Sequence, residues 1–157
     1  MCGRFVNIND KKYIQKTFNA QNLTYFNNKS YNISPGQNVD VIISEKGNYF
    51  IESLIWGYSF LDKQSKFLKH IINSRLETIN TKLLFKDSFL KRKCIILSNG
   101  YYEWKTKENK KKPYFINLPV NELICFAGIW RNEKREGKNV KVCSIITKNA
   151  HSNISYI

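Results

Sequence analysis

Runs of apolar residues predict strands in two parts of the chain. Residues 39–44 and 49–60 are rich in β-branched and aromatic side chains, and the turn between them contains the permissive Gly47, which together predict a hairpin. The second half contains four further apolar runs that predict strands, at residues 94–97 continuing through Tyr101 and Tyr102, 113–118, 122–130 and 140–147. Strands therefore dominate the expected fold.

Helical spacing of apolar residues is limited to two stretches. Asn9 is the expected N-cap of a helix over residues 10–19, whose apolar side consists of Tyr13, Ile14 and Phe18. Residues 75–92 predict one or two short helices, with an apolar stripe formed by Leu83, Leu84, Phe85, Phe89 and Leu90. The polar segment 19–38 predicts a loop anchored by Tyr25 and Phe26 and turned by Pro35 and Gly36.

The length and the absence of internal repeats or linker-like composition predict one α+β domain over residues 1–157. No segment reaches the roughly 18 to 20 apolar residues of a membrane helix, and the first ten residues lack the apolar region of a signal peptide. We therefore expect a soluble, cytoplasmic protein that contacts no membrane. The cysteines at positions 2, 94, 125 and 143 form no CxxC pair, so we expect reduced thiols and no metal site.

The charge balance favours an acidic macromolecular partner. Lys and Arg together number 26 against 12 Asp and Glu, which gives a formal net charge of +14. Residues 105–112 and 131–139 are strongly basic and are expected to be connections between strands that offer contacts to phosphate groups.

Cys2 has the most distinctive chemistry in the chain. Removal of the initiator Met would leave a cysteine whose amine and thiol sit on adjacent carbons. An α-amine, with a pKa of about 7.7 to 8.0, can form an imine with an aldehyde. The thiol can then add to the imine carbon and close a thiazolidine ring, which no internal cysteine can do. Position 2 alone leaves open that this cysteine has no role.

A series of short motifs identifies a family. The chain reads MCGRF at residues 1–5, YNISPGQ at 31–37, WGYSF at 56–60, INSRLETI at 72–79, KRKCIILSNGYYEWK at 91–105, KKPYFI at 111–116, FAGIW at 126–130 and IITKNA at 145–150. In this order they resemble the SRAP family, the SOS response-associated peptidases, whose vertebrate member shields abasic sites by crosslinking to them. The resemblance covers residues 1–157. It implies a β-rich fold of mainly antiparallel, barrel-like sheets with a few short helices, and no cofactor.

The resemblance implies catalytic roles for three residues. Cys2 matches the N-terminal nucleophile of the family, and its target would be the ring-opened aldehyde of an abasic site in single-stranded DNA. Asn73 matches the active-site Asn, a neutral group suited to orienting the amine or a sugar hydroxyl; otherwise it is a loop cap. Glu103 matches the catalytic Glu, a general acid if it is desolvated between Tyr102 and Trp104; otherwise it is a surface carboxylate.

The resemblance also implies contacts to DNA. Arg75 is expected to bind a phosphate beside the lesion, and the alternative is an ion pair with Glu77. Arg4 is a further candidate for DNA binding. Trp56, Tyr101 and Trp104 either stack on bases or close the core; we favour the core for Trp104 and leave both alternatives open for Trp56.

The chain departs from the family at its end. In the family a catalytic His, in a His-x-Arg-Met-Pro element, follows the Thr-x-x-Ala step by about eight residues. Thr147 and Ala150 match that step, but the sequence stops at Ile157. His151 falls at an earlier position that is usually polar in the family, and His70 matches nothing catalytic. We therefore expect a domain without its C-terminal strands, with exposed strand edges.

Three functions remain at this point. The first is a monomeric enzyme that crosslinks to abasic sites, with associated lyase activity and autoproteolytic removal of Met1. The second is an N-terminal-nucleophile peptidase or amidohydrolase that uses Cys2 on an acyl substrate. The third is a non-catalytic basic surface that binds single-stranded DNA without regard to the lesion.

Overall fold

The computed structural model describes residues 2–22, 26–62, 64, 66–108, 110–119 and 123–152. These residues form a β-rich structure with two short helices, which confirms the α+β class. The elements in chain order are β1 (Arg4–Asn7), α1 (Lys11–Phe18), β2 (Ala20–Asn22), β3 (Ser30–Ile33), β4 (Asn38–Glu45), β5 (Asn48–Trp56), β6 (Tyr58–Leu61), β7 (Leu68–Ile71), β8 (Asn73–Arg75), α2 (Leu83–Lys91), β9 (Lys93–Ser98), β10 (Gly100–Lys107), β11 (Lys110–Ile116), β12 (Ile124–Arg135) and β13 (Lys138–Thr147).

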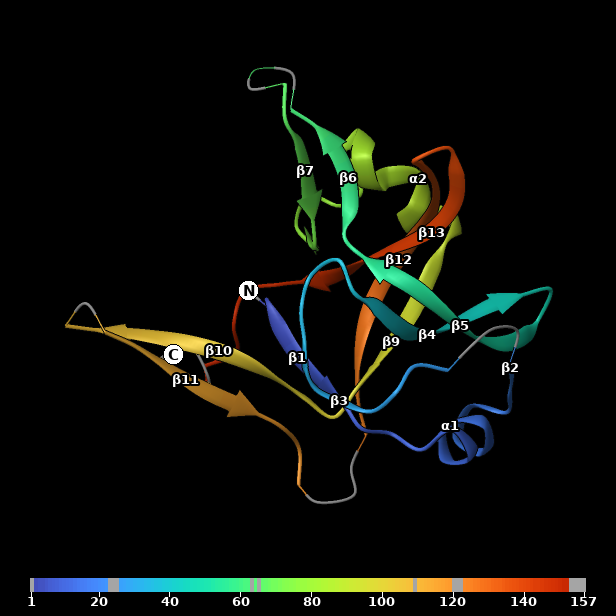
Figure 1. Ribbon diagram of the computed structural model, residues 1–157, viewed down its shortest axis with the longest axis horizontal. Coiled ribbons are helices and arrows are strands. Elements are labelled where there is room, and N and C mark those ends of the chain that lie inside the picture. Colours follow the sequence, from blue (N-terminus) through green and yellow to red (C-terminus); the bar gives the residue numbers. More distant parts are fainter. Residues whose placement is uncertain are drawn as a thin grey trace.

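Five strands close into a barrel. They follow the order β5, β4, β9, β12 and β13, with antiparallel neighbours throughout. A short parallel pairing of β13 with β5, at Val142 with Ile55 and Cys143 with Trp56, closes the ring. The predicted 39–60 hairpin corresponds to β4 and β5, and β2 and β8 add to the barrel as parallel neighbours of β5 and β13 (Figure 1).

Alternation along the barrel strands separates an interior from an outer surface. On β4, Val39, Val41 and Ile43 belong to the main core cluster inside the barrel. Ile42, between them, belongs to a second cluster in which Ile14 of α1 covers the outside of the barrel. The strand pattern in the sequence is therefore that of a barrel wall buried on both faces.

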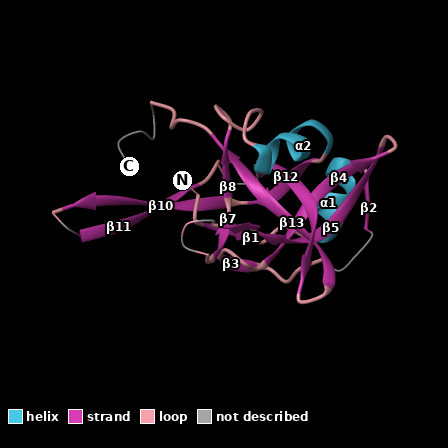
Figure 2. Cartoon of the chain, turned by 90° about the horizontal axis from the view of Figure 1, so that it is seen from above, coloured by secondary structure: helices cyan, strands magenta, loops and turns pink. Residues whose placement is uncertain are grey.

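A second sheet, in the order β11, β10, β1 and β3, is antiparallel throughout and carries the N-terminal segment. Phe5 of β1 joins this sheet to the barrel, with its ring centroid 5.0 Å from that of Trp56 and 5.5 Å from that of Phe126. The β10–β11 hairpin projects away from the barrel, on the side opposite the helices (Figures 1 and 2).

Glycine is favoured at two positions in this framework, one by a close approach and one by its backbone conformation. A Cβ atom on Gly100, at the start of β10, would lie 2.6 Å from the Phe115 ring and 2.7 Å from the Ile116 carbonyl oxygen. Gly57, between β5 and β6, has a φ of +131°, which side-chain-bearing residues rarely adopt. Both positions lie where the chain leaves the barrel.

Both helices are shorter than expected. The N-cap of α1 is Asp10 rather than Asn9, and its side chain accepts hydrogen bonds from the amides of Lys12 and Tyr13. The Asn9 amide is engaged elsewhere, donating 2.8 Å to Asn7 Oδ1 and 3.3 Å to the Ser98 carbonyl oxygen. In the 75–92 stretch only residues 83–91 are α-helical. The predicted apolar stripe was wrong at Leu83 and Leu90, which are 93% and 64% exposed.

Other boundaries also differ from the prediction. The 49–60 strand is interrupted at Gly57, the run from 94 to 102 divides between β9 in the barrel and β10 in the second sheet, and the 19–38 loop contains β2 and β3. Most of the basic segments 105–112 and 131–139 continues the strands of the two hairpins instead of forming long connections. Tyr25, Glu122 and Ile157 lie outside the described residues. Within the described part, neither helix has the length and apolar character needed to cross a membrane.

Candidate functional site

A pocket of about 660 Å³ lies where the second sheet meets the barrel. It gathers residues from the N-terminal segment, β8, β10 and the segment after β13, which are far apart in the sequence. Its lining consists of Cys2, Arg75, Glu77, Tyr101, Glu103, Trp104, Ile116, Phe126, Ile145, Ile146, Thr147, Lys148, Asn149, Ala150 and His151. Three of the predicted site residues, Cys2, Arg75 and Glu103, therefore share one pocket.

Cys2 lines this pocket and is only 5% exposed. Its Sγ is 3.8 Å from the Arg4 carbonyl oxygen. Burial, and then the nearby Glu103 carboxylate, raise the pKa of the Cys2 thiol to about 12. Both causes disfavour a negative charge on sulfur, so the thiol is neutral near pH 7.

Asn73 fixes the backbone of Cys2. Its Nδ2 donates a hydrogen bond of 2.9 Å to the Cys2 carbonyl oxygen, across 71 positions of sequence. The parallel pairing of β8 with β13, which places Asn73 beside Ile145, carries the side chain to this point. Among the described residues, Asn73 Oδ1 is buried without a hydrogen-bond partner, so the same amide has an unused acceptor next to Cys2.

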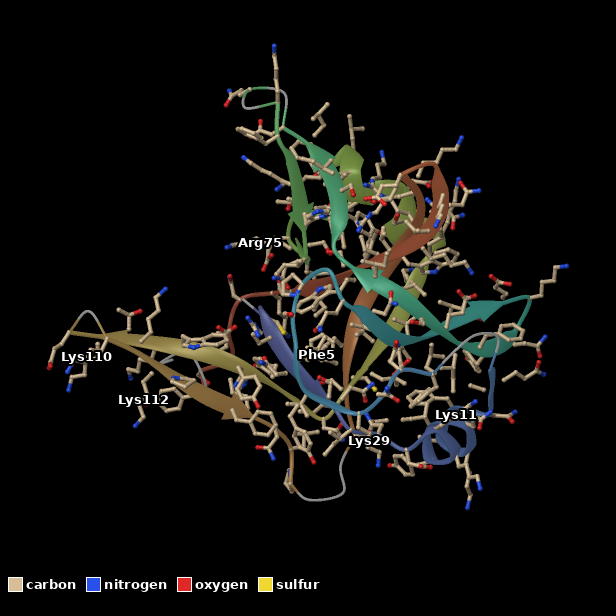
Figure 3. All side chains as sticks on the ribbon, viewed as in Figure 1. Phe5, Lys11, Lys29, Arg75, Lys110 and Lys112 are labelled. Atoms are coloured by element: carbon tan, nitrogen blue, oxygen red, sulfur yellow. The ribbon has the colours of Figure 1, made fainter. Side chains whose placement is uncertain are left out.

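Arg75 lies two residues further along β8 and is exposed at the pocket rim. Its side chain extends outward near the start of β1 (Figure 3). Glu77 accepts a hydrogen bond of 3.3 Å from the Asn149 amide, and no ion pair between Arg75 and Glu77 occurs in the described part of the chain. Arg75 is therefore an exposed member of the pocket lining.

Glu103 enters the pocket from β10, where it pairs with Tyr114 of β11. The residue is half-buried. Its carboxylate is close enough to Cys2 and to Tyr101 to raise the pKa of both, after the larger effect of their burial. An acidic group and a buried thiol thus lie within electrostatic range of each other.

The sequence profile of the SOS response associated peptidase (SRAP) family matches residues 1–157. This chain belongs to the SRAP family. It is 34% identical over 152 residues to a Bacillus subtilis relative named abasic site processing protein YoqW, covering 94% of this chain and 68% of the relative. Escherichia coli YedK, named in the same way, is 30% identical over 120 residues, covering 74% of this chain and 51% of YedK.

The SRAP fold is also found among solved structures. A crystal structure of a Bacteroides thetaiotaomicron protein superimposes with a TM-score of 0.83 at 22% sequence identity, over 99% of this chain and 72% of the other. That likeness confirms the barrel-like fold expected from the resemblance.

Two predicted DNA-binding residues of this SRAP chain lie outside the pocket. Arg4 is exposed on β1, and its Nη1 donates 2.9 Å to Asn32 Oδ1 on β3. Trp56 is fully buried in the main core cluster, and its Nε1 donates 3.0 Å to the Ile72 carbonyl oxygen. Of the two alternatives for Trp56, stacking on a base is therefore wrong for this structure and closure of the core is correct. The predicted core position of Trp104 was wrong, because this side chain is 39% exposed and lines the pocket.

The pocket wall formed by the end of β13 and the residues after it was not predicted from the sequence. His151, which matched no catalytic position, lines the pocket. The residues from Thr147 to Asn149 complete the wall because β8 and Glu77 hold that segment through backbone pairing and one amide contact. The IITKNA motif was the available signal, although it does not by itself indicate a lining role. The described residues contain no cluster of three or more His, Cys, Asp or Glu side chains able to hold a metal ion.

Proposed function

We propose that this chain processes abasic sites in single-stranded DNA, and that Cys2 becomes covalently joined to the damaged sugar. The observation that carries the proposal is the pocket in which Cys2, Glu103 and Arg75 converge, with Asn73 bonded to Cys2. The names of the curated relatives, abasic site processing proteins, support the choice of substrate. The pocket volume of about 660 Å³ is ample for one sugar without its base.

The first step requires the α-amine of Cys2 and therefore removal of Met1, which lies outside the described residues. Glu103 accepts the proton of the ammonium group, and the neutral amine attacks the aldehyde carbon to give a carbinolamine. Glu103 then returns the proton to the carbinolamine hydroxyl, which leaves as water; the resulting iminium ion releases its N–H proton to solvent, and a neutral imine remains. Asn73 holds the Cys2 carbonyl, so the amine has a fixed position, and Asn73 Oδ1 offers an acceptor for its N–H.

In the second step the Cys2 thiol adds to the imine. A carbon–sulfur bond forms, the sulfur proton passes to the imine nitrogen, and the five-membered thiazolidine closes. The balance of both steps is one aldehyde plus one cysteine giving one thiazolidine plus water. The same imine also acidifies the neighbouring sugar carbon, so the proposal includes strand cleavage by β-elimination when ring closure is slow.

The thiol environment favours this order over acyl transfer. A thiol whose pKa is raised to about 12 is a poor starting nucleophile for an amide, which requires a thiolate. An amine-first route needs the thiol only after the imine has formed. Arg75, at the rim, would hold a phosphate next to the lesion in the orientation that its planar donors allow.

The test is intact mass spectrometry and denaturing electrophoresis after mixing the protein with an oligonucleotide that contains one abasic site. We expect a stable adduct whose mass is the Met-free protein plus the oligonucleotide minus one water. Cys2→Ser should give only an imine, visible after borohydride reduction, because it retains the amine and loses the thiol. Cys125→Ser is the matched control and should retain the full adduct.

The same experiment separates the alternatives. A stable adduct with Cys2→Ala in the absence of borohydride would contradict the mechanism. Amide hydrolysis by a wild-type protein that ignores the aldehyde would establish the acyl-transfer function. Equal, salt-sensitive binding of damaged and intact strands, with no adduct, would establish the non-catalytic DNA-binding function.

A further inference from the structure

Trp56 contacts both segments of the chain that meet at Cys2. Its side chain is fully buried in the main core cluster. The ring of Phe5, which follows Cys2 by three positions, packs edge-on against it with the centroids 5.0 Å apart. The Trp56 Nε1 donates a hydrogen bond of 3.0 Å to the carbonyl oxygen of Ile72, the residue before Asn73. One buried ring therefore joins the segment of Cys2 to the segment of the residue that binds Cys2.

Ile72 occupies a point where the chain passes from one sheet to another. It is the single residue between β7, which pairs with β6, and β8, which pairs with β13. Its carbonyl oxygen accepts two hydrogen bonds of 3.0 Å, one from the Ile145 amide and one from Trp56 Nε1. This carbonyl group and the amide nitrogen of Asn73 belong to one planar peptide unit. Donors on two different strands thus fix the peptide from which the Asn73 side chain begins.

The indole is itself held in place. The Trp56 amide donates a hydrogen bond of 2.9 Å to the Gln37 carbonyl oxygen, and the Trp56 carbonyl oxygen accepts one of 2.8 Å from the Gly36 amide. Trp56 also pairs with Cys143 where β5 meets β13 and the barrel closes. With both polar backbone groups bonded and the ring enclosed by the core, the indole N–H is a fixed donor.

Core packing alone does not explain a tryptophan at this position. A phenylalanine or leucine fills apolar space without a polar atom, whereas a buried indole N–H requires an acceptor. At Trp56 the acceptor is the Ile72 carbonyl group, and Asn73 Nδ2 then donates 2.9 Å to the Cys2 carbonyl oxygen. Two hydrogen bonds and one peptide unit therefore connect the barrel core to the backbone of the nucleophile.

We propose that Trp56 is a positioning residue for the reaction at Cys2, because its indole N–H holds the Ile72 carbonyl group and so keeps the Asn73 amide in place against Cys2. This inference rests on the proposed function, in which the position of the Cys2 amine limits the first step. Trp56 is fully buried and touches neither the DNA nor the reacting atoms. Its contribution should therefore appear in the rate of crosslinking and not in the affinity for DNA.

The test replaces Trp56 by benzothienylalanine, an analogue in which sulfur takes the place of the indole N–H and the ring shape is retained. Single-turnover crosslinking at saturating abasic oligonucleotide should slow by roughly twofold to tenfold, as expected for the loss of one neutral hydrogen bond. The oligonucleotide concentration that gives half of the maximal rate should not change. The same replacement at Trp130 is the matched control and should retain the wild-type rate, because Trp130 packs against the same core cluster and Lys141 lies over its ring.

A double-substitution cycle separates positioning from a general loss of stability. If Trp56 acts through Asn73, the benzothienylalanine replacement should slow the wild-type protein but cause no further loss in Asn73→Ala. An equal loss in both backgrounds would refute the proposal. Trp56→Phe also lacks the N–H but leaves a cavity, so its Tm should be lower than that of the analogue protein, while its rate per folded molecule should be the same.

A second readout uses the free protein and is independent of the chemistry. The Asn73 side-chain amide gives its own pair of signals in nitrogen-edited NMR spectra. The Trp56 replacement should shift this pair and accelerate its hydrogen exchange with solvent, and the Trp130 replacement should leave it unchanged. An Asn73 signal that does not respond to the Trp56 replacement would refute the positioning role.

The outcomes distinguish this inference from the proposed function. No adduct between the wild-type protein and any abasic substrate would refute the proposed function. A wild-type protein that forms the adduct, together with a Trp56 analogue protein that forms it equally fast, would refute the role of Trp56 alone.

Discussion

Replacement of Asn73 by Ala tests whether positioning of the Cys2 backbone limits the reaction. The substitution removes one neutral hydrogen bond of 2.9 Å, whose net contribution is typically about 0.5 to 1.5 kcal/mol. If the whole of this free energy serves to hold the nucleophile in place, its loss raises the activation barrier by the same amount, and crosslinking should slow by roughly twofold to tenfold. If the Cys2 carbonyl is left without any donor in its buried site, the cost is instead about 1 to 3 kcal/mol, which sets the upper limit at roughly 150-fold.

Asn73→Asp should be more damaging than Asn73→Ala. It places a carboxylate oxygen, instead of a donor, against the Cys2 carbonyl oxygen, so two acceptors face each other. The backbone pairing of β8 with β13 is retained in both variants, and thermal unfolding should therefore change much less than the reaction rate.

The assay is a single-turnover time course on an abasic oligonucleotide, quenched in parallel with and without borohydride. If Asn73 positions the amine, imine trapping and thiazolidine formation should slow by the same factor. A wild-type rate for Asn73→Ala, or a rate loss no greater than the loss of folded protein, would refute the positioning role. Slower ring closure with unchanged imine formation would also refute it, since the amide would then act on the thiol.

Three further predictions concern charge and packing. Arg75→Ala should reduce the salt dependence of single-strand binding by about 0.7 in the log–log slope, one phosphate contact, whereas Lys86→Ala on α2 should leave the slope unchanged. Burial raises the pKa of Asp40 from 3.8 to about 6, so the folded state favours the protonated carboxyl group. The resulting stabilisation, up to about 3 kcal/mol, is complete below about pH 4 and is lost as the pH rises to about 6. The Tm profiles of wild type and Asp40→Asn should diverge across this pH window, and parallel profiles would contradict the assignment. Gly128→Ala would place a Cβ 2.8 Å from a β9 side chain inside the barrel, and should destabilise the fold by about 1 to 3 kcal/mol, visible as a lower Tm. Gly3→Ala is the control and should leave Tm unchanged, because its Cβ would meet no atom within 4 Å.

The long strands could be predicted from the sequence because local composition determines them. The 39–60 hairpin has dense β-branched residues on both sides of a glycine turn, and its pairing is between neighbours in the chain. The short strands β1 and β8 could not be predicted in this way. Each has only three or four residues and pairs with a strand far away in the chain, as Arg4 does with Tyr102 and Asn73 with Ile145, so no periodicity is visible.

The candidate site shows the same limit. The motifs that carry the resemblance indicated Cys2, Asn73, Arg75 and Glu103, but their convergence depends on long-range pairings that no spacing reveals. Trp56 illustrates the opposite case, since a tryptophan in a motif is equally compatible with a binding surface and with a core. Its complete burial in the main core cluster and the packing of Phe5 against its ring distinguish the two.

The closure of the barrel has a consequence for the order of events during synthesis. The parallel contact of β13 with β5 involves only two residue pairs, and its β13 side, at Val142 and Cys143, leaves the ribosome after most of this chain. Until then the pocket wall from Ile145 onward does not exist, and the N-terminus has no completed site in which to be buried. We therefore expect the initiator methionine to be most accessible to processing on the nascent chain. The amine that the proposed chemistry requires would thus be exposed before the pocket that encloses it has formed.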